Sequence, residues 1–137
     1  MLKTACINPE LTGLLAACGH GDKILIADGN YPIGSNTGEN TQKVYIGLTH
    51  GVPTVTQVLE VIDKTLSIEA AEVMVPGSGE EQEIFGEFRS ILPENVVLGK
   101  LNRYEFYEAC KQDNVKIAVS TGEKRVFANI LITVGVA

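Results

Sequence analysis

His20 and Asp28 are the two side chains whose type and position best suit acid–base chemistry in this chain. They lie on either side of a short apolar run, Ile24 to Ala27, which has the character of a core strand. A histidine side chain donates and accepts protons near neutral pH. Because strand ends hold side chains rigidly, we predict a site built around this strand, with Asp28 at the end where open α/β sheets bind ligands.

Each of these residues also has a purely structural interpretation. His20 lies in a Gly-His-Gly turn, where it can be a surface residue, and Asp28 precedes Gly29-Asn30, where its side chain can close an Asx turn. Asp22 is expected to be a turn residue or a partner for His20. His50 follows another strand-like run and is a weaker candidate.

The composition indicates a single domain, residues 1–137, of an ordinary soluble class. A chain of this length buries a core without a metal or disulfide staple. The net charge of −6 argues against nucleic acid or an anionic membrane as partner and favours a neutral or cationic small molecule. No apolar run approaches the ~20 residues of a membrane span. The N-terminus has no secretion signal, and the three cysteines match no zinc or redox motif, so we expect a cytoplasmic protein.

Hydrophobic periodicity predicts the elements that position these groups. Helices are expected to follow Asn8-Pro9, to open at Pro53, to run over 80–91, and to follow a capping box at Asn102 and Glu105. Phe106 and Tyr107 have the spacing of core residues on the last of these helices. Strands are expected over residues 24–27, 43–48, 67–75, 96–98, 115–120 and 127–134, with a long polar loop over 29–42. This alternation predicts an α/β fold, a three-layer α/β/α domain with a largely parallel sheet of about six strands.

Several short motifs follow one another from near the first residue to the last. They are Gly19-His20-Gly21-Asp22, Asp28-Gly29-Asn30-Tyr31-Pro32, Gly51-Val52-Pro53, Arg103-Tyr104-Glu105-Phe106-Tyr107, Thr121-Gly122-Glu123, Phe127-Ala128-Asn129-Ile130-Leu131 and Gly135-Val136. Together and in this order they resemble the D-ribose pyranase / L-fucose mutarotase family over essentially the whole chain.

The resemblance implies a cofactor-free mutarotase, without a metal, that interconverts anomers or ring forms of a free monosaccharide. It assigns the role of proton donor to His20 and sugar binding to Asp28. Arg103 aligns with an arginine that contacts sugar in fucose-type members, where ribose-type members carry histidine. Residues 48–51 are closer to ribose-type members and residues 103–107 to fucose-type members, so the identity of the sugar stays open.

The resemblance also places Phe127, Ala128 and Asn129 in the wall of the sugar pocket. Most members carry tyrosine where this chain has Phe127, so a hydroxyl that could relay a proton is missing. Members assemble into ring-like homo-oligomers, which can be decamers, and form their sites between subunits. The implied mechanism has His20 protonate the ring oxygen while Asp28, Asn129 and Arg103 bind hydroxyls.

Three other interpretations compete with this one. The first is a metal-dependent hydrolase or isomerase that uses His20, Asp22, Asp28 and His50, although their spacing is irregular for zinc. The second is a phosphohistidine carrier or sugar-sensing protein that uses His20. The third is a homologue that binds sugar without converting it, in which Phe127 in place of tyrosine accounts for the reduced catalysis.

Overall fold

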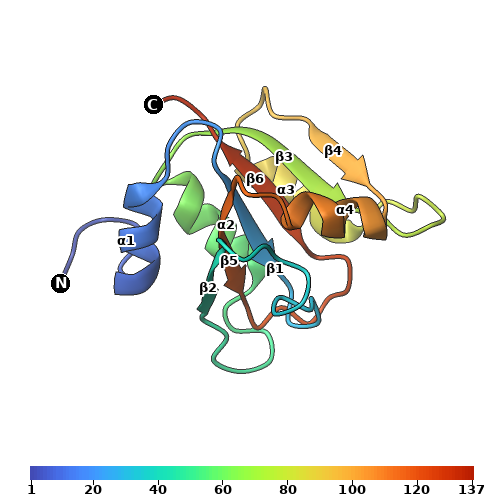
Figure 1. The fold of residues 1–137 in the computed structure, drawn as a ribbon, viewed down its shortest axis with the longest axis horizontal. Helices are drawn as coiled ribbons and strands as arrows, with labels where there is room; N and C mark the ends of the chain where they lie inside the picture. The colour runs from blue at the N-terminus through green and yellow to red at the C-terminus, as the bar shows by residue number, and fades with distance from the viewer.

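The computed structural model describes residues 1–137 and shows a six-stranded sheet with helices on both faces (Figure 1). The strands are β1 (Lys23–Ala27), β2 (Gln42–Tyr45), β3 (Ile68–Met74), β4 (Leu98–Leu101), β5 (Val115–Ser120) and β6 (Ile130–Val134). Their order is β2-β5-β1-β6-β3-β4, and all neighbours are parallel except β6, which is antiparallel to both β1 and β3. The predicted three-layer α/β domain with a largely parallel six-stranded sheet is confirmed.

The four helices are α1 (Pro9–Ala17), α2 (Val55–Asp63), α3 (Glu83–Ile91) and α4 (Arg103–Cys110). The Asn8 side chain caps α1, and the predicted capping box of Asn102 and Glu105 caps α4. Pro53 does not open α2, because Thr54 is its N-cap and forms a capping box with Gln57. None of these helices is long and apolar enough to cross a bilayer.

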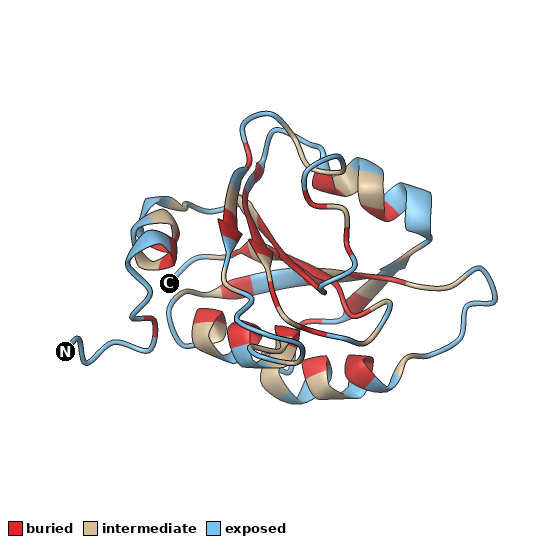
Figure 2. Cartoon of the chain, turned by 90° about the horizontal axis from the view of Figure 1, so that it is seen from below, coloured by how far each residue is buried: buried red, intermediate tan, exposed pale blue.

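Two apolar clusters fill the space on either side of the sheet, and the sheet residues are buried between them (Figure 2). Strand β1 serves both clusters, since Ile24 and Ile26 point to one and Leu25 and Ala27 to the other. Helices α1, α2 and α3 contribute to the larger cluster, and α4 with the loop after β1 contributes to the smaller. This two-sided burial explains why β1 is an unbroken apolar run.

Several predicted boundaries are wrong by a few residues. The predicted helix over 80–91 begins only at Glu83, and β4 lies later than expected. Strand β6 starts at Ile130 and not at residue 127. Phe127 has a φ of 53°, a left-handed conformation that no strand accommodates, so the segment up to Asn129 is a turn leading into the strand.

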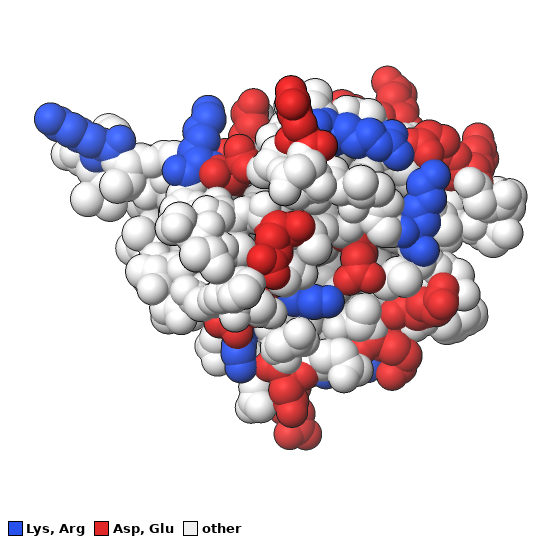
Figure 3. Space-filling view, turned by 90° about the horizontal axis from the view of Figure 1, so that it is seen from above, with Lys and Arg blue, Asp and Glu red and all other residues white.

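Charged side chains of both signs are interspersed on the face shown in Figure 3. The three cysteines are free thiols, with Cys6 and Cys110 buried and Cys18 half-buried. Burial raises the pKa of Cys110 to about 12 and also raises that of Cys18. The prediction of buried thiols holds for two of the three.

Candidate functional site

Asp28 follows the last residue of β1 and is almost fully buried. Its Oδ1 accepts hydrogen bonds from the backbone N–H groups of Asn30 and Tyr31, both at 2.9 Å. Its Oδ2 accepts from the N–H of Ala128 at 3.3 Å, and its own N–H donates to Oδ1 of Asn129 at 2.8 Å. The Asx turn is therefore real, and the same carboxylate ties the turn to the segment that precedes β6.

Burial raises the pKa of the Asp28 carboxyl, although the N–H groups of Asn30, Ala128 and Tyr31 and the side chain of Asn129 oppose that rise. Buried carboxylates with a perturbed pKa are common at functional sites. Oδ1 already accepts two hydrogen bonds, whereas Oδ2 accepts one and retains a lone pair for a further donor. The carboxylate is thus held rigidly and can still bind a hydroxyl.

A cavity of about 210 Å³ opens beside Asp28. Its lining residues come from the end of β1, the following loop, β3, α4 and the segment before β6: Asp28, Asn30, Tyr31, Pro32, Met74, Arg103, Tyr107, Val126, Phe127 and Asn129. Typical pockets for drug-sized ligands have roughly 300–1,000 Å³, so this cavity suits a smaller molecule. Four of the predicted site residues, Asp28, Arg103, Phe127 and Asn129, line it. Ala128 is fully buried and contributes its N–H group to Asp28.

Arg103, the first residue of α4, places a cation at the cavity. Its Nε donates to the hydroxyl of Tyr107 at 3.1 Å, and its guanidinium lies 5.5 Å from the centre of that ring. The hydrogen bond from Arg103 to Tyr107 raises the pKa of the guanidinium. The Nη groups remain available as charge-assisted donors to a ligand.

Tyr107 and Tyr31 are the cavity residues that sequence reasoning missed. Tyr107 packs against the smaller apolar cluster, as its spacing predicts, but it is only partly buried, lines the cavity and accepts a hydrogen bond from Arg103. Tyr31 packs edge-on against Tyr107, with ring centres 5.5 Å apart, and donates its hydroxyl to the carbonyl of Asn36 at 2.9 Å. Burial raises the pKa of Tyr31. The sequence signal for Tyr31 is its place in the motif that begins at Asp28.

The loop between β5 and β6 carries Phe127 and is fixed at its base. Thr121 donates from both N–H and hydroxyl to the carbonyl of Ala27, at 3.2 and 2.8 Å. Gly122 lies against residues 49–52, because a Cβ there would stand 2.6 Å from the carbonyl oxygen of Val52 and closer still to that of Thr49. The loop after β2 and the loop after β5 are therefore packed backbone to backbone.

Glu123 and Arg125 fix the same loop to α3. The Glu123 side chain is only 4% exposed and accepts from Arg125 Nη2 at 3.0 Å, while Arg125 also pairs with Glu87 of α3. Burial alone would raise the pKa of Glu123, but the hydrogen bonds and charge of Arg125 outweigh it and hold that pKa below its usual range. Bonds to both carboxylates raise the pKa of Arg125. The sequence predicts a polar turn over residues 121–125, and it does not reveal the buried carboxylate within that turn.

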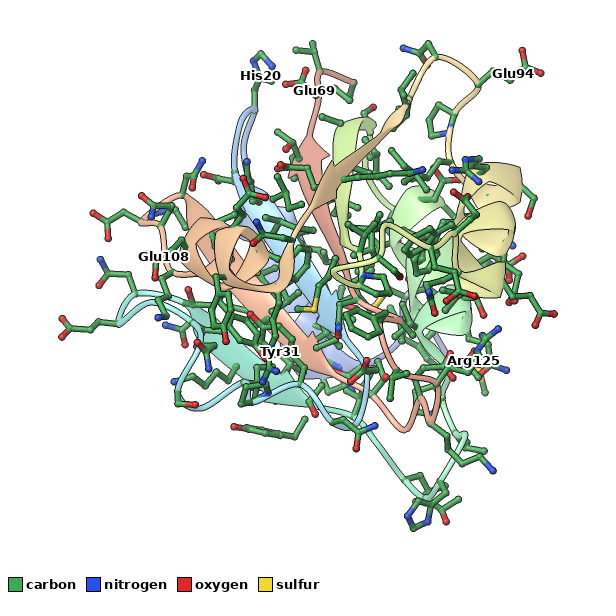
Figure 4. All side chains as sticks on the ribbon, turned by 90° about the vertical axis from the view of Figure 1, so that its right-hand side faces the viewer. His20, Tyr31, Glu69, Glu94, Glu108 and Arg125 are labelled. Atoms are coloured by element: carbon green, nitrogen blue, oxygen red, sulfur yellow. The ribbon has the colours of Figure 1, made fainter.

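His20 does not reach this cavity. It lies in the turn before β1, beside Glu69, at the opposite end of the sheet from Tyr31 (Figure 4). Strand β1 alone spans about 16 Å at ~3.3 Å per residue. The prediction that His20 and Asp28 act on one ligand is therefore not met within a single chain. Asp22 is a turn residue, whose Oδ2 accepts from the N–H of Gly19 at 2.8 Å, and the partner of His20 is Glu69.

The alternative metal site is not assembled. His20 and Asp28 lie at opposite ends of the sheet, and His50 is an exposed residue of a neighbouring groove of about 630 Å³, which shares only Asn30 with the cavity. No group of three or more His, Cys, Asp or Glu side chains is arranged to hold a metal ion.

Comparison with known proteins adds sequence and fold relatives. A model of the RbsD / FucU transport protein family matches residues 1–137. A D-ribose pyranase of Psychromonas ingrahamii is 34% identical over 99% of this chain and 99% of its own length, and a fucose mutarotase of Homo sapiens is 33% identical over 96% and 90%. The fucose mutarotase from Streptococcus pneumoniae, solved in complex with L-fucose, has a TM-score of 0.82 at 27% identity, covering 100% of this chain and 99% of its own. Bacillus subtilis RbsD complexed with D-ribose shares the fold, with a TM-score of 0.84 at 24% identity over 100% and 99%.

Proposed function

The chain belongs to the RbsD / FucU transport protein family, and from this premise we propose that it is an isomerase, a mutarotase that interconverts the anomers or ring forms of a free monosaccharide. The observation that carries the proposal is the small cavity in which a buried carboxylate, a carboxamide and a guanidinium converge between aromatic walls. Such a mixture of acceptors and donors matches the vicinal hydroxyls of a sugar, and aromatic rings match its C–H faces.

The hydrogen bonds already made by the cavity residues determine what each can offer to the sugar. The Oδ1 of Asn129 accepts from the N–H of Asp28, so Nδ2 is the group through which this carboxamide can donate. Asp28 offers the acceptor, and Arg103 offers its Nη donors. Tyr107 accepts from Arg103 and therefore keeps its own hydroxyl proton to donate. It supplies a phenolic hydroxyl at the cavity that Phe127 lacks.

Mutarotation needs only proton transfer. The anomeric O–H loses its proton to water while a protonated His20 gives a proton to the ring oxygen, and the bond between C1 and that oxygen breaks. The free aldehyde rotates and the reverse transfers close the ring. A positioned acid or base contributes ~10²–10⁴-fold, which is sufficient for a reaction that also proceeds without a catalyst.

His20 takes part in this scheme only if a neighbouring subunit presents it. His20 and the cavity lie at opposite ends of one chain, and the His20 side chain is 59% exposed. Contacts that join two different surfaces of identical subunits form rings when the rotation between neighbours closes, and open filaments when it does not. We therefore assign the site to a ring-like homo-oligomer in which His20 of one subunit faces the cavity of the next.

Saturation-transfer NMR on L-fucose and D-ribose tests the activity directly. Wild-type protein is expected to accelerate anomer exchange of one of these sugars, and His20→Ala is expected to lose ~10²-fold or more of that acceleration. Unchanged exchange in His20→Ala would remove His20 from the mechanism. Saturable sugar binding without faster exchange in the wild type would identify the binding-only alternative, which the phenylalanine at position 127 favours.

Subunit mixing tests the shared site. His20→Ala and Asp28→Ala variants are each expected to be inactive, because each lacks one half of every site. When equal amounts are unfolded and refolded together, about a quarter of the interfaces should pair an intact His20 with an intact cavity. Recovery of activity in the mixture supports the shared site, and a mixture as inactive as its components contradicts it.

A further inference from the structure

Glu69 is the second residue of β3 and lies at an irregularity in the sheet. The pairing of β3 with β6 shifts register between Ile68 and Ala70, so Glu69 is the extra residue of a β-bulge. As a result, Glu69 and Ala70 are both exposed although they are neighbours on one strand. Bulges redirect a side chain and occur often beside active sites. This bulge directs the Glu69 carboxylate across the end of β6 toward the turn that carries His20.

The contact between the two side chains is a hydrogen bond of 2.9 Å from His20 Nε2 to Glu69 Oε2. An ionised carboxylate only accepts hydrogen bonds, so the shared proton resides on Nε2. The neutral imidazole is then the Nε2–H tautomer, and Nδ1 is the nitrogen that remains free to exchange a proton with a ligand.

The backbone around this pair is fixed by the end of β6. Gly21 N–H donates to the carbonyl of Val134 at 2.9 Å, and Val134 N–H donates to the carbonyl of Asp22 at 2.8 Å. At Gly135 an added Cβ would lie 3.1 Å from Cβ of Glu69 and 3.6 Å from its Oε2. The Glu69 side chain thus passes over Gly135 on its way to His20, and the absence of a side chain there keeps that path open.

We propose that Glu69 is a positioning residue that holds His20 in one tautomer and orientation, with Nδ1 directed at the sugar of the neighbouring subunit's cavity. The role rests on the proposed function of His20. Carboxylate partners of this kind fix the ring and stabilise the protonated imidazole while the other nitrogen transfers the proton. Glu69 itself does not touch the reacting atoms.

Two substitutions and one matched control test the role. Glu69→Ala removes the acceptor, and Glu69→Gln keeps an oxygen that can accept the Nε2–H bond. The control is Glu72→Ala on the same strand, since Glu72 pairs with Lys23 at 3.2 Å and has no contact with His20. All three are measured for sugar exchange by NMR and for folding by circular dichroism.

Loss of the partner is expected to reduce kcat by about tenfold to a hundredfold in Glu69→Ala, with KM within about twofold, as for other carboxylate partners of functional histidines. The kcat of Glu69→Gln should lie between those of Glu69→Ala and the wild type, and the kcat of Glu72→Ala should match that of the wild type. The same loss in Glu72→Ala, or no loss in Glu69→Ala, overturns the proposal.

The tautomer provides a readout that does not depend on activity. The chain has only two histidines, so His50→Gln leaves a single imidazole for ¹⁵N NMR. In the His50→Gln protein, His20 should show the Nε2–H tautomer. Adding Glu69→Ala should shift His20 toward a mixture of both tautomers. An unchanged tautomer in Glu69→Ala overturns the proposal even if no sugar is turned over, whereas absent mutarotation with the expected tautomer shift counts against the proposed function alone.

Discussion

Replacing Arg125 by methionine is expected to destabilise the protein more than any other single loss of an ion pair. Arg125 donates to Glu123 from its N–H at 3.3 Å, from Nε at 3.2 Å and from Nη2 at 3.0 Å. It also donates to both oxygens of Glu87. The Arg125→Met variant keeps most of the aliphatic volume but leaves the carboxylate of Glu123, which is only 4% exposed, without its counter-ion.

The magnitude follows from how deeply each partner is buried. Removing one partner of a fully buried pair costs ~3–5 kcal/mol, because the other charge stays desolvated. Arg125 is 38% exposed, so water can reach part of the pair, and we expect about 2–3 kcal/mol of lost unfolding free energy at neutral pH. For a domain of this size that loss lowers Tm by roughly 6–12 °C.

The pH dependence distinguishes this mechanism from simple loss of packing. In the wild type the pKa of Glu123 is lowered, so its contribution is present above the unfolded pKa of about 4.3 and is lost as the pH falls through the folded pKa. In Arg125→Met the side-chain hydrogen bonds and the positive charge are lost, and only backbone N–H donors still oppose the effect of burial. The pKa of Glu123 is therefore expected to be higher than in the wild type, so protonation relieves the cost at low pH. The difference in unfolding free energy between the wild type and Arg125→Met should therefore be largest near pH ~7 and smallest near pH ~4.

Urea unfolding followed by far-UV circular dichroism, at one fixed protein concentration, measures both effects. The matched control is Arg89→Met, because Arg89 and Glu81 form an ion pair in which both side chains are almost half exposed. Such a solvent-exposed pair contributes little to stability. An Arg125→Met variant no less stable than Arg89→Met, or equally destabilised at both pH values, would refute the reasoning.

Further predictions concern a helix cap, the cavity carboxylate and the thiols. Asn102→Ala should cost about 1 kcal/mol in urea unfolding, because it removes the cap of α4; no measurable change would contradict the cap. Burial raises the pKa of Asp28, so its stability contribution is complete below the unfolded pKa and is lost as the pH rises through the folded one. As the pH rises from ~4 to ~7, the Tm of Asp28→Asn should therefore increase relative to that of the wild type. The same variant should lose sugar binding in calorimetry. A Tm difference that does not change with pH would contradict the raised pKa. A thiol reagent should modify only Cys18 in the native protein, and slowly, since its thiol is half-buried with a raised pKa; equal reaction of Cys6 or Cys110 would contradict the burial.

Local signals predict most of the fold. Asn8 and the pair Asn102 and Glu105 cap helices through hydrogen bonds within four residues, and such bonds can be inferred from spacing alone. The strand over Val115–Ser120 is predicted with its observed bounds because its apolar residues serve both faces of the sheet and only Lys116 interrupts them. The start of β6 is missed because Phe127 adopts a left-handed conformation and the next two residues are hydrogen-bonded to Asp28, about 100 residues away, which no local pattern reveals.

The site is predictable only in part, because its contacts join residues far apart in sequence. The link between Asp28 and Asn129 spans 101 residues and is expected only through the family resemblance. Helical spacing places Tyr107 in the core because it cannot distinguish a residue under the sheet from one at the rim of a cavity. Glu69, the partner of His20, lies 49 residues away, and Glu87, one of the two partners of Arg125, lies 38 residues away. These contacts cannot be inferred from sequence neighbours alone.

The packing of Gly122 against residues 49–52 limits how this protein could acquire a different sugar preference. Gly122 N–H donates to the carbonyl of Pro53 at 2.9 Å, and its own carbonyl accepts from Gly51, so the two loops share hydrogen bonds as well as contact. An insertion in either loop would break bonds in both and loosen the base of the segment that carries Phe127. Specificity can therefore evolve, or be engineered, through point substitutions in the cavity wall, such as at positions 107 and 127, while the lengths of both loops stay constant.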